Sequence, residues 1–466
     1  MTAAKKSKDI STACVILAAG KGVRMKSDLP KVLHEIGGRP MVRYSVDCAM
    51  ELGCDPVVVV LGNGAELVRK VLPEDVGTAI QEKQLGTGHA AQCGLSAVDG
   101  VERVLVLYGD TPLLTADTLA ELLDTHASGN KPLAMLTADM PQPNRLGRVV
   151  RNASGDVERV IEAADASPQE LALTEINAGI YVADLEFLKT ALDKIKPQNA
   201  QGEYYLTDIV QLAADGGGVA AYKIEDHLEV LGVNDRIEQA AAQKAMNART
   251  LVRLMTGGVT ILDTDNTYVQ PPVAVGPETV IYPGAVIEGM TSIGSGCVIG
   301  PGVFIRDSKI GDGVEIKSNS VVDSSNVGDG TAVGPSAHLR PASDIGPNCR
   351  IGNFVETKKV VMGEGTKASH LTYLGDAKIG KNVNIGCGTI TCNYDGAEKH
   401  LTIIEDDVFV GSDSQLVAPI TVKKGAYIGS GSTLTKDVEP GALCVTRANR
   451  RDIPGGGDRL KKKKKK

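Results

Sequence analysis

An aliphatic residue recurs at every sixth position over two long runs in the second half of the chain. The residues are Val275, Ile281, Ile287, Ile293, Ile299 and Ile305, then Val410, Leu416, Val422, Ile428 and Leu434. A helix repeats at about 3.6 residues and a plain strand at about 2, so neither explains the spacing. Coils with three short flat faces, each pointing one aliphatic side chain inward, do explain it, and we predict a parallel β-helix.

Glycine often follows the inward aliphatic residue of this repeat. Because glycine adopts positive φ without strain, we expect these glycines to ease the corners of the coil. They are Gly276, Gly294, Gly300, Gly311, Gly328, Gly334, Gly346 and Gly352.

The first half lacks the sixfold repeat, and 466 residues exceed the usual size of one compact domain, so at least two domains are expected. Asp235 could cap a helix whose apolar residues recur at three- and four-residue steps until Gly257-Gly258 ends it. We therefore predict a first domain over 1–234, a linker helix over 235–257, a β-helix over 258–455 and a disordered basic tail over 456–466.

Composition narrows the classes of protein. The chain is 42% hydrophobic and 23% charged with a net charge of −7, which indicates a soluble globular protein and argues against a nucleic-acid partner. No apolar stretch is long enough to span a membrane or to act as a signal peptide. Nine cysteines without a CxxC pair indicate reduced thiols in a cytoplasmic protein and make a zinc site unfavoured. The terminal lysine run is read as a solvated tail, with polyanion binding as the weaker alternative.

A glycine-rich turn follows the first apolar run. Cys14 to Leu17 reads as a buried strand that passes into LAAGKGVRM, which places Gly20 and Gly22 beside several cations. Glycines let backbone N–H groups approach phosphate oxygens, and the cations neutralise them. An ordinary structural turn is the alternative, and the spacing matches neither the GxGxxG nor the GxxxxGK[ST] motif.

Further segments extend this α/β pattern. Val57 to Leu61 and Val104 to Tyr108 read as strands, and Pro40 to Leu52 reads as a helix. The alternation predicts a Rossmann-like, largely parallel sheet, whose ligands gather at the carboxyl ends of the strands. Asp110 follows a strand at that edge, where it is either a turn former or a Mg²⁺ ligand.

Long motifs along the chain carry a resemblance. In order they are LAAGKGVRM, DLPKVLHEIGGRPM, QLGTGHA, YGDTPLL, INAGIY, QGEYYLTDIV and EVLGVND. The first half resembles the uridylyltransferase domain of the bacterial bifunctional UDP-N-acetylglucosamine pyrophosphorylase and glucosamine-1-phosphate N-acetyltransferase family, and the second half resembles the acetyltransferase domain of the same family. The resemblance implies that the β-helix is left-handed and that the protein is a homotrimer with an acyl site between subunits.

The resemblance implies roles for residues of the first half. Lys31 and Arg24 match catalytic contacts to the triphosphate, and Asp110 and Asn234 match Mg²⁺ ligands. The matching UTP and UDP-sugar contacts are Leu17, Ala18, Ala19, Gly20, Lys21, Gln81, Gly86, Thr87, Tyr108, Gly109, Asp110, Gly147, Glu162, Asn177 and Asn234. Two departures fall on the sugar side, because Arg145-Leu146 stands in place of Gly-Tyr and Ala163-Ala164 stands where the family has a lysine nearby.

The sixfold repeat breaks over 356–377 and 388–403, and both breaks are rich in polar residues, so function is expected there. The resemblance places acetyl transfer at this point, with His370 as the general base for the sugar amine. A histidine satisfied in a turn is the alternative. Matches to glucosamine-1-phosphate contacts are Arg340, Lys358, Tyr373, Asn384 and Lys399, and matches to acetyl-CoA contacts are Cys387, Asn393, Tyr394, Ser412, Ser430 and Arg447. Cys387 could also suggest a nucleophile, but its small neighbours favour a packing role.

The implied chemistry has two steps. Acetyl-CoA and glucosamine-1-phosphate give N-acetylglucosamine-1-phosphate, which reacts with UTP in the presence of Mg²⁺ to give UDP-N-acetylglucosamine and pyrophosphate. One alternative keeps only nucleotidyl transfer and treats the β-helix as an oligomerising or regulatory arm, as in ADP-glucose pyrophosphorylases. Another is a non-catalytic scaffold that binds sugar nucleotides.

Overall fold

The computed structural model of the chain describes residues 10–446, 450–455, 457 and 459. Its internal contacts divide the chain into two compact units that meet between Met246 and Asn247. Within the described residues, no helix has the length and apolar character needed to cross a membrane.

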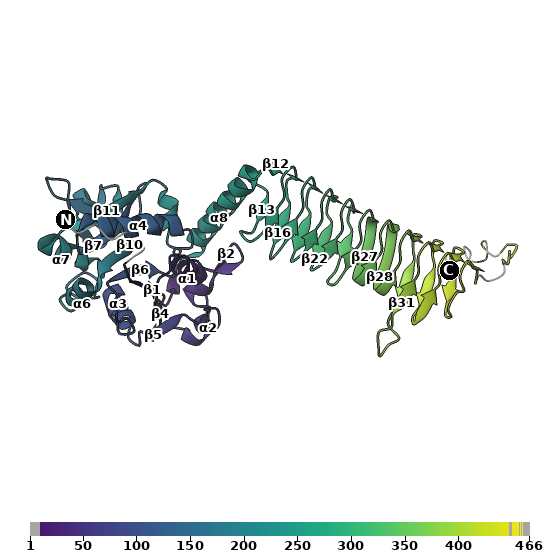
Figure 1. The fold of residues 1–466 in the computed structure, drawn as a ribbon, viewed down its shortest axis with the longest axis horizontal. Coiled ribbons are helices and arrows are strands. Elements are labelled where there is room, and N and C mark those ends of the chain that lie inside the picture. Colours follow the sequence, from purple (N-terminus) through teal and green to yellow (C-terminus); the bar gives the residue numbers. More distant parts are fainter. Residues whose placement is uncertain (1–9, 447–449, 456, 458, 460–466) are drawn as a thin grey trace. The chain divides into compact units, whose positions relative to one another are not determined.

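A twisted sheet forms the centre of the first unit (Figure 1). The strand order along it is β11 (Val219–Ile224), β7 (Leu133–Asp139), β10 (Glu175–Asp184), β6 (Arg103–Tyr108), β1 (Thr12–Leu17), β4 (Val57–Leu61) and β5 (Gly77–Ile80), with β8 (Arg148–Arg151) and β9 (Val157–Ile161) attached at β10. β10 runs antiparallel to its neighbours, and β1, β4, β5 and β6 run parallel to one another. The sheet is therefore largely parallel, as predicted, and the three strands and the one helix expected from the sequence are present as β1, β4, β6 and α1.

Helices cover both faces of this sheet. Side chains of β1 alternate between two cores, because Val15 and Leu17 pack on one side while Cys14 and Ile16 pack on the other. The first core takes residues from α3 (Thr87–Leu95), α6 (Leu185–Leu192) and α7 (Asp208–Gly216), and the second from α1 (Met41–Glu51), α2 (Ala65–Arg69) and α4 (Ala116–Gly129). The shorter elements are η2 (Val23–Met25), η3 (Lys31–Leu33), η4 (His227–Val230), α5 (Pro168–Leu171), β2 (Glu35–Ile36) and β3 (Arg39–Pro40).

Helix α8 (Arg236–Thr256) contains the division between the units. The Asp235 carboxylate accepts hydrogen bonds from the backbone N–H groups of Ile237 and Glu238, so the predicted cap is confirmed. Ala242 packs in a core of the first unit, and Leu251 and Leu254 pack at the start of the core of the second.

The second unit is a parallel β-helix built from short strands (Figure 1). In order they are β12 (Thr260–Ile261), β13 (Tyr268–Val269), β14 (Ala274–Val275), β15 (Val280–Ile281), β16 (Val286–Glu288), β17 (Ser292–Ile293), β18 (Val298–Ile299), β19 (Phe304–Arg306), β20 (Lys309–Ile310), β21 (Glu315–Ile316), β22 (Val321–Asp323), β23 (Asn326–Val327), β24 (Ala332–Val333), β25 (His338–Leu339), β26 (Asp344–Ile345), β27 (Arg350–Met362), β28 (Lys367–Ile379), β29 (Asn384–Ile385), β30 (Ile390–Cys392), β31 (Thr402–Ile404), β32 (Phe409–Val410), β33 (Gln415–Val417), β34 (Ile420–Val422), β35 (Tyr427–Ile428), β36 (Thr433–Leu434) and β37 (Leu443–Cys444).

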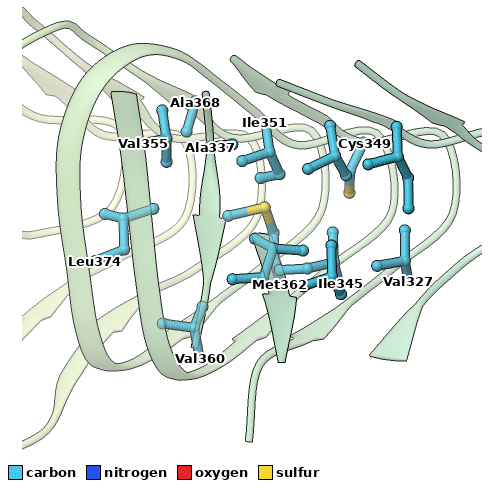
Figure 2. Packing of buried hydrophobic residues seen from close by; sticks show 14 of the residues in the cluster. Val327, Ala337, Ile345, Cys349, Ile351, Val355, Val360, Met362, Ala368 and Leu374 are labelled. Atoms are coloured by element: carbon cyan, nitrogen blue, oxygen red, sulfur yellow. The ribbon is translucent and has the colours of Figure 1, made fainter. Parts of the chain in front are cut away.

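The inward aliphatic residues form one continuous column. Val280 pairs with Val298 and Ile281 with Ile299, one coil further along, so equivalent side chains stack directly. Figure 2 shows Val327, Ile345 and Met362 among the buried side chains that fill the interior. This arrangement confirms the predicted fold class, an α/β domain followed by a left-handed parallel β-helix.

The glycines after the aliphatic residues have a different role from the one predicted. Of those eight, Gly334 has positive φ, at 96°, whereas the left-handed residues of the coil are others, such as Gly296 and Gly302. A Cβ on Gly276 would lie 2.7 Å from the carbonyl carbon of Gly294 in the next coil, and one on Gly352 would lie 1.8 Å from the Ser369 oxygen. Glycine is needed at these positions because successive coils approach too closely for a side chain.

The two predicted breaks in the repeat also differ from each other. Over 356–377 the stacking is regular, because β27 and β28 are long strands that pair along their length, with Glu356 beside Tyr373. The coil merely continues as strand through its corners. Over 388–403 there is a true insertion, since Ile390 pairs with Gln415 and the extra residues form a loop that leaves the coil beside β31 (Figure 1).

Candidate functional sites

In the first unit, two strand ends bring the predicted nucleotide residues together. β1 and β6 pair in parallel with Leu17 beside Tyr108, and the N–H of Gly109 donates to the Leu17 carbonyl over 3.0 Å. The glycine-rich turn that follows β1 and the segment ending at Asp110 therefore leave the sheet at the same edge. This is the edge where parallel sheets bind their ligands.

The turn after β1 is shaped by Gly22. Its backbone is left-handed, with φ at 60°, and a Cβ there would lie 2.7 Å from the Cβ of Lys31. Glycine thus allows the turn to lie against Lys31. Gly20 has open space where its side chain would be, which leaves its backbone accessible to a ligand.

Three charged and polar groups converge at this edge. The Lys31 ammonium forms an ion pair with Asp110 and donates to the Asn234 side-chain oxygen over 2.9 Å. Asn234 comes from the segment before α8, more than 120 positions after Asp110 in the sequence. A carboxylate oxygen and an amide oxygen thus both face the Lys31 ammonium group. Oxygen atoms of these two kinds are also ligands that Mg²⁺ prefers.

These groups lie in a cavity of about 380 Å³. Its lining includes the predicted residues Leu17, Ala18, Ala19, Gly20, Lys21, Lys31, Gln81, Gly86, Thr87, Tyr108, Asp110 and Asn234. It also includes four residues that the sequence did not single out, Val32, Gln84, Ala90 and Glu203. All four lie in the motifs that carry the resemblance, and Gln84 Nε2 donates to the Ala19 carbonyl over 2.7 Å.

One wall of the cavity is fixed by close packing around Gly86. A Cβ there would lie 2.5 Å from the Tyr204 carbonyl oxygen, and the Gly86 carbonyl accepts from Gln81 Nε2 over 3.0 Å. Thr87 accepts a hydrogen bond from the Leu206 N–H over 3.0 Å. The two segments that contain Gln81 and Tyr204 are therefore joined across the cavity wall.

The predicted sugar-side residues form a separate group. The Asn177 N–H donates to the Gly147 carbonyl over 2.9 Å, and Glu162 accepts from Thr207 over 3.2 Å. Burial raises the pKa of Glu162. Glu162 lines a neighbouring cavity of about 350 Å³ together with Arg145, Ala163, Ala164, Gln201 and Tyr205, so both departures noted in the sequence border this space.

Four predicted residues line neither cavity: Gly147 and Asn177, which are hydrogen-bonded to each other, and Arg24 and Gly109. Arg24 is exposed on η2, and Gly109 is buried, with its Cβ position 3.2 Å from the Ala18 side chain. Gly109 therefore packs beneath the turn.

In the second unit, three cations gather on one face of the β-helix. Lys399, followed by Arg340, lowers the pKa of Lys358, because ammonium and guanidinium groups disfavour a further positive charge nearby. Arg340 Nη1 pairs with Glu356 Oε1 over 2.6 Å, and Tyr373 stands beside Glu356 on the adjacent strand. An excess of cations at one spot suits a phosphate dianion.

The inserted loop carries Lys399 to this cluster. The His400 N–H donates to the Asn393 carbonyl over 2.8 Å and closes the loop at its base. The Asp395 carboxylate is hydrogen-bonded to the Glu398 N–H, the His400 side chain and the Ala397 N–H, and these contacts hold its pKa well below the usual range. Asn393 Nδ2 donates to Asp376. The predicted residue Tyr394 is exposed on this loop.

Four predicted residues occupy one outer corner of successive coils. They are His370, Cys387, Ser412 and Ser430, all of them exposed. The Gly388 N–H donates to the Leu371 carbonyl over 2.8 Å, which joins the coil of His370 to that of Cys387. The Asp413 N–H donates to the Cys387 carbonyl over 2.7 Å and the Gly431 N–H to the Ser412 carbonyl over 2.8 Å, so the four residues stack coil on coil. We call this row the corner column. Asn384 precedes it on β29, and Arg447 lies outside the described residues.

The nine cysteines, all within the described part of the chain, are free thiols. In that part no group of three or more His, Cys, Asp or Glu side chains is arranged to hold a metal ion.

Two domain families match parts of the chain. Residues 14–178 match the MobA-like NTP transferase domain, and residues 269–343 match the GMPPB C-terminal domain. The first match covers most of the residues that line the cavity, and Glu203 and Asn234 lie beyond it. The second covers the early coils of the β-helix.

Curated relatives match over nearly their full length. The chain is 51% identical over 440 residues to the bifunctional protein GlmU of Trichlorobacter lovleyi, covering 94% of this chain and 96% of the relative. It is 49% identical to that of Geotalea uraniireducens, covering 97% and 99%, and 50% identical to that of Halalkalibacterium halodurans, covering 93% and 96%. Since this identity extends through both units, the chain belongs to the family of bifunctional GlmU proteins.

Proposed function

We propose that the second unit acetylates glucosamine-1-phosphate with acetyl-CoA and that the first unit then transfers a uridylyl group from UTP to the product with the help of Mg²⁺. As a GlmU protein, the chain is a bifunctional enzyme of UDP-N-acetylglucosamine synthesis with a nucleotidyltransferase unit.

The observation that carries the first activity is the meeting of Lys31 with Asp110 and Asn234 in the cavity. The two oxygens already face a cation, so a carboxylate and an amide are available to Mg²⁺ without any change of donor type. When bound, Mg²⁺ neutralises negative charge on the phosphates of the nucleotide. Lys31 and Lys21 supply further positive charge on the same wall.

The reaction in the first unit needs no protein nucleophile. An oxygen of the sugar phosphate forms a bond to the α-phosphorus of UTP, while the bond from that phosphorus to the β-phosphate oxygen breaks and pyrophosphate leaves. Catalysis then consists of positioning the two phosphates and neutralising their charge. The accessible backbone at Gly20 and the ammonium groups of Lys21 and Lys31 suit these tasks.

In the second unit we assign the phosphate of glucosamine-1-phosphate to Arg340, Lys358 and Lys399. The amine nitrogen attacks the thioester carbonyl, the C–S bond breaks, and coenzyme A leaves as the thiol after taking up a proton. His370 accepts the proton that the amine loses, which a neutral imidazole can do near working pH.

We further propose that the active form is a homotrimer whose acyl site lies between copies. The cationic cluster and the corner column lie on outward-facing surfaces, and large apolar side chains beside them are exposed. Phe354 is 61% exposed and Leu371 is 59% exposed. Apolar surface next to a polar site favours coverage by another copy of the chain.

The two half-reactions can be separated with one reagent. Full-length protein given acetyl-CoA and glucosamine-1-phosphate should release free thiol with or without EDTA. Protein given UTP and N-acetylglucosamine-1-phosphate should release pyrophosphate with added Mg²⁺, and EDTA should stop it. Thiol release that depends on metal, or pyrophosphate release that survives EDTA, would contradict the assignment.

A further inference from the structure

Asn353 holds the imidazole ring of His370. The two residues face each other across the paired strands β27 and β28, and Asn353 Oδ1 lies 3.2 Å from His370 Nδ1. Nε2 of the ring makes no hydrogen bond to any residue that the structure describes. One ring nitrogen is thus engaged by the protein and the other is open to a ligand.

The backbone around this pair leaves little room for movement. A Cβ on Gly352 would lie 1.8 Å from the carbonyl oxygen of Ser369, so the residues just before Asn353 and His370 are in close contact. Thr372 Oγ1 donates to the His370 carbonyl over 2.6 Å. The pair is therefore set on two strands whose register is fixed on both sides of it.

The chemistry of the contact determines the tautomer. An amide oxygen only accepts hydrogen bonds, so Nδ1 of the facing imidazole must carry the proton. In the neutral ring Nε2 then has a free lone pair, which is the form that a general base requires. A ring protonated at Nε2 would instead point a hydrogen at the incoming amine.

We propose that Asn353 is a positioning residue that keeps His370 in the tautomer and orientation able to accept a proton at Nε2. This inference rests on the proposed role of His370 as general base. It differs from a purely structural role for Asn353, in which the side chain would only stabilise the coil.

Asn353→Ala tests the proposal. Turnover in acetyl transfer should fall by roughly 10- to 100-fold, by analogy with removal of the outer partner that orients a metal-binding histidine, while the KM for acetyl-CoA stays unchanged. Asn326→Ala is a matched control, because Asn326 is an exposed asparagine on another strand of the same β-helix. Wild-type turnover in Asn353→Ala would overturn the inference.

Asn353→Asp separates positioning from stability. The carboxylate still accepts from Nδ1, so activity should return at alkaline pH. Its negative charge favours the imidazolium form, so the acidic limb of the rate profile should move to higher pH than in the wild type. A profile unchanged from the wild type would count against the contact.

The double variant Asn353→Ala/His370→Ala keeps the test decisive if Asn353→Ala loses activity because it is only partly folded. If Asn353 acts through His370, the double variant should lose no more turnover than His370→Ala alone, whereas an independent role predicts a further loss. The hypothesis that His370 is the general base is tested independently, because it requires His370→Ala itself to lose turnover. Full activity in His370→Ala would reject the base, while a normal loss there with multiplying losses in the double variant would reject the positioning role.

Discussion

The two candidate sites of this protein are built in opposite ways. In the first unit, segments far apart in sequence meet at one sheet edge, and their side chains line a cavity that includes Lys31, Asp110 and Asn234. In the second unit, the corner column and the cationic cluster lie on outward surfaces of a regular coil. A folded sheet can enclose a small ligand within one unit, whereas a solid β-helix has no interior space and offers only its faces. The contrast predicts that the first activity depends on local convergence and the second also depends on what covers the face.

The largest effect is expected from Asp110→Ala, which removes the carboxylate that faces Lys31. Uridylyl transfer should fall by about 10⁴-fold, because a metal at the phosphates contributes several kcal/mol to the transition state. Acetyl transfer by the same protein should be unchanged. Pyrophosphate release and thiol release measure the two activities, and Asp99→Ala, at a side chain 93% exposed, serves as the control. Near-normal uridylyl transfer would remove Asp110 from the site.

His370→Ala should produce the reverse pattern. Acetyl-transfer turnover should drop by about 10³-fold, within the range for loss of a general base, and uridylyl transfer should persist. Steady-state kinetics on acetyl-CoA distinguish the possibilities. Loss of binding with full turnover at saturation would make His370 a binding residue.

Lys358→Ala should have a moderate effect on the second site. Removing one of three cations should raise the KM for glucosamine-1-phosphate by roughly 10- to 100-fold with a smaller change in turnover, as expected for a charged hydrogen-bond partner. The effect should weaken as salt increases, because the cluster is on an exposed face. Lys309→Ala, on an earlier coil, is the control, and equal effects in both variants would argue against a localised phosphate site.

The smallest effect concerns the stability of the first unit, whose candidate site is enclosed. Burial raises the pKa of Glu162, so the folded protein binds this proton more readily than the unfolded chain does. Stability from this group is therefore present at low pH and lost as pH rises through the raised pKa. Glu162→Gln should unfold at a higher urea concentration than the wild type at pH 8 and at a similar one at pH 4. A less stable variant at pH 8 would show that the Thr207 hydrogen bond outweighs the burial.

The sequence predicted the two folds well because each has its own periodicity. The sixfold repeat located the buried column, and the Asp235 and Gly257 signals bounded α8 within a residue. The sequence predicted the wrong role for the glycines that follow the aliphatic residues. Their role depends on the distance between successive coils, which a local sequence pattern does not reveal. The sequence also read a break over 356–377, where longer strands simply replace the usual short ones.

Prediction of the site residues depended on where the deciding contacts were. The strand-end residues were accessible to reasoning because parallel strands place their ends together. Gln84 and Glu203 were missed although both lie in recognised motifs, because their place in the cavity depends on how two loops meet. The contact between Asn353 and His370 was likewise hidden. The two residues are seventeen positions apart in the sequence, and they can be recognised as neighbours only when the number of residues in that coil is known.

Stacked coils also act as a ruler. Neighbouring strands in a sheet are about 4.8 Å apart, so the four residues of the corner column mark out a line of roughly 14 Å in equal steps. A molecule that touches His370 at one end and Ser430 at the other has to be long and narrow, and it must lie parallel to the axis of the helix. An acyl group carried on an extended flexible arm has that form. A compact acyl donor of the same reactivity could contact only one residue of the corner column. Selection by length would thus come from the repeat itself, without any side chain chosen to reject shorter donors.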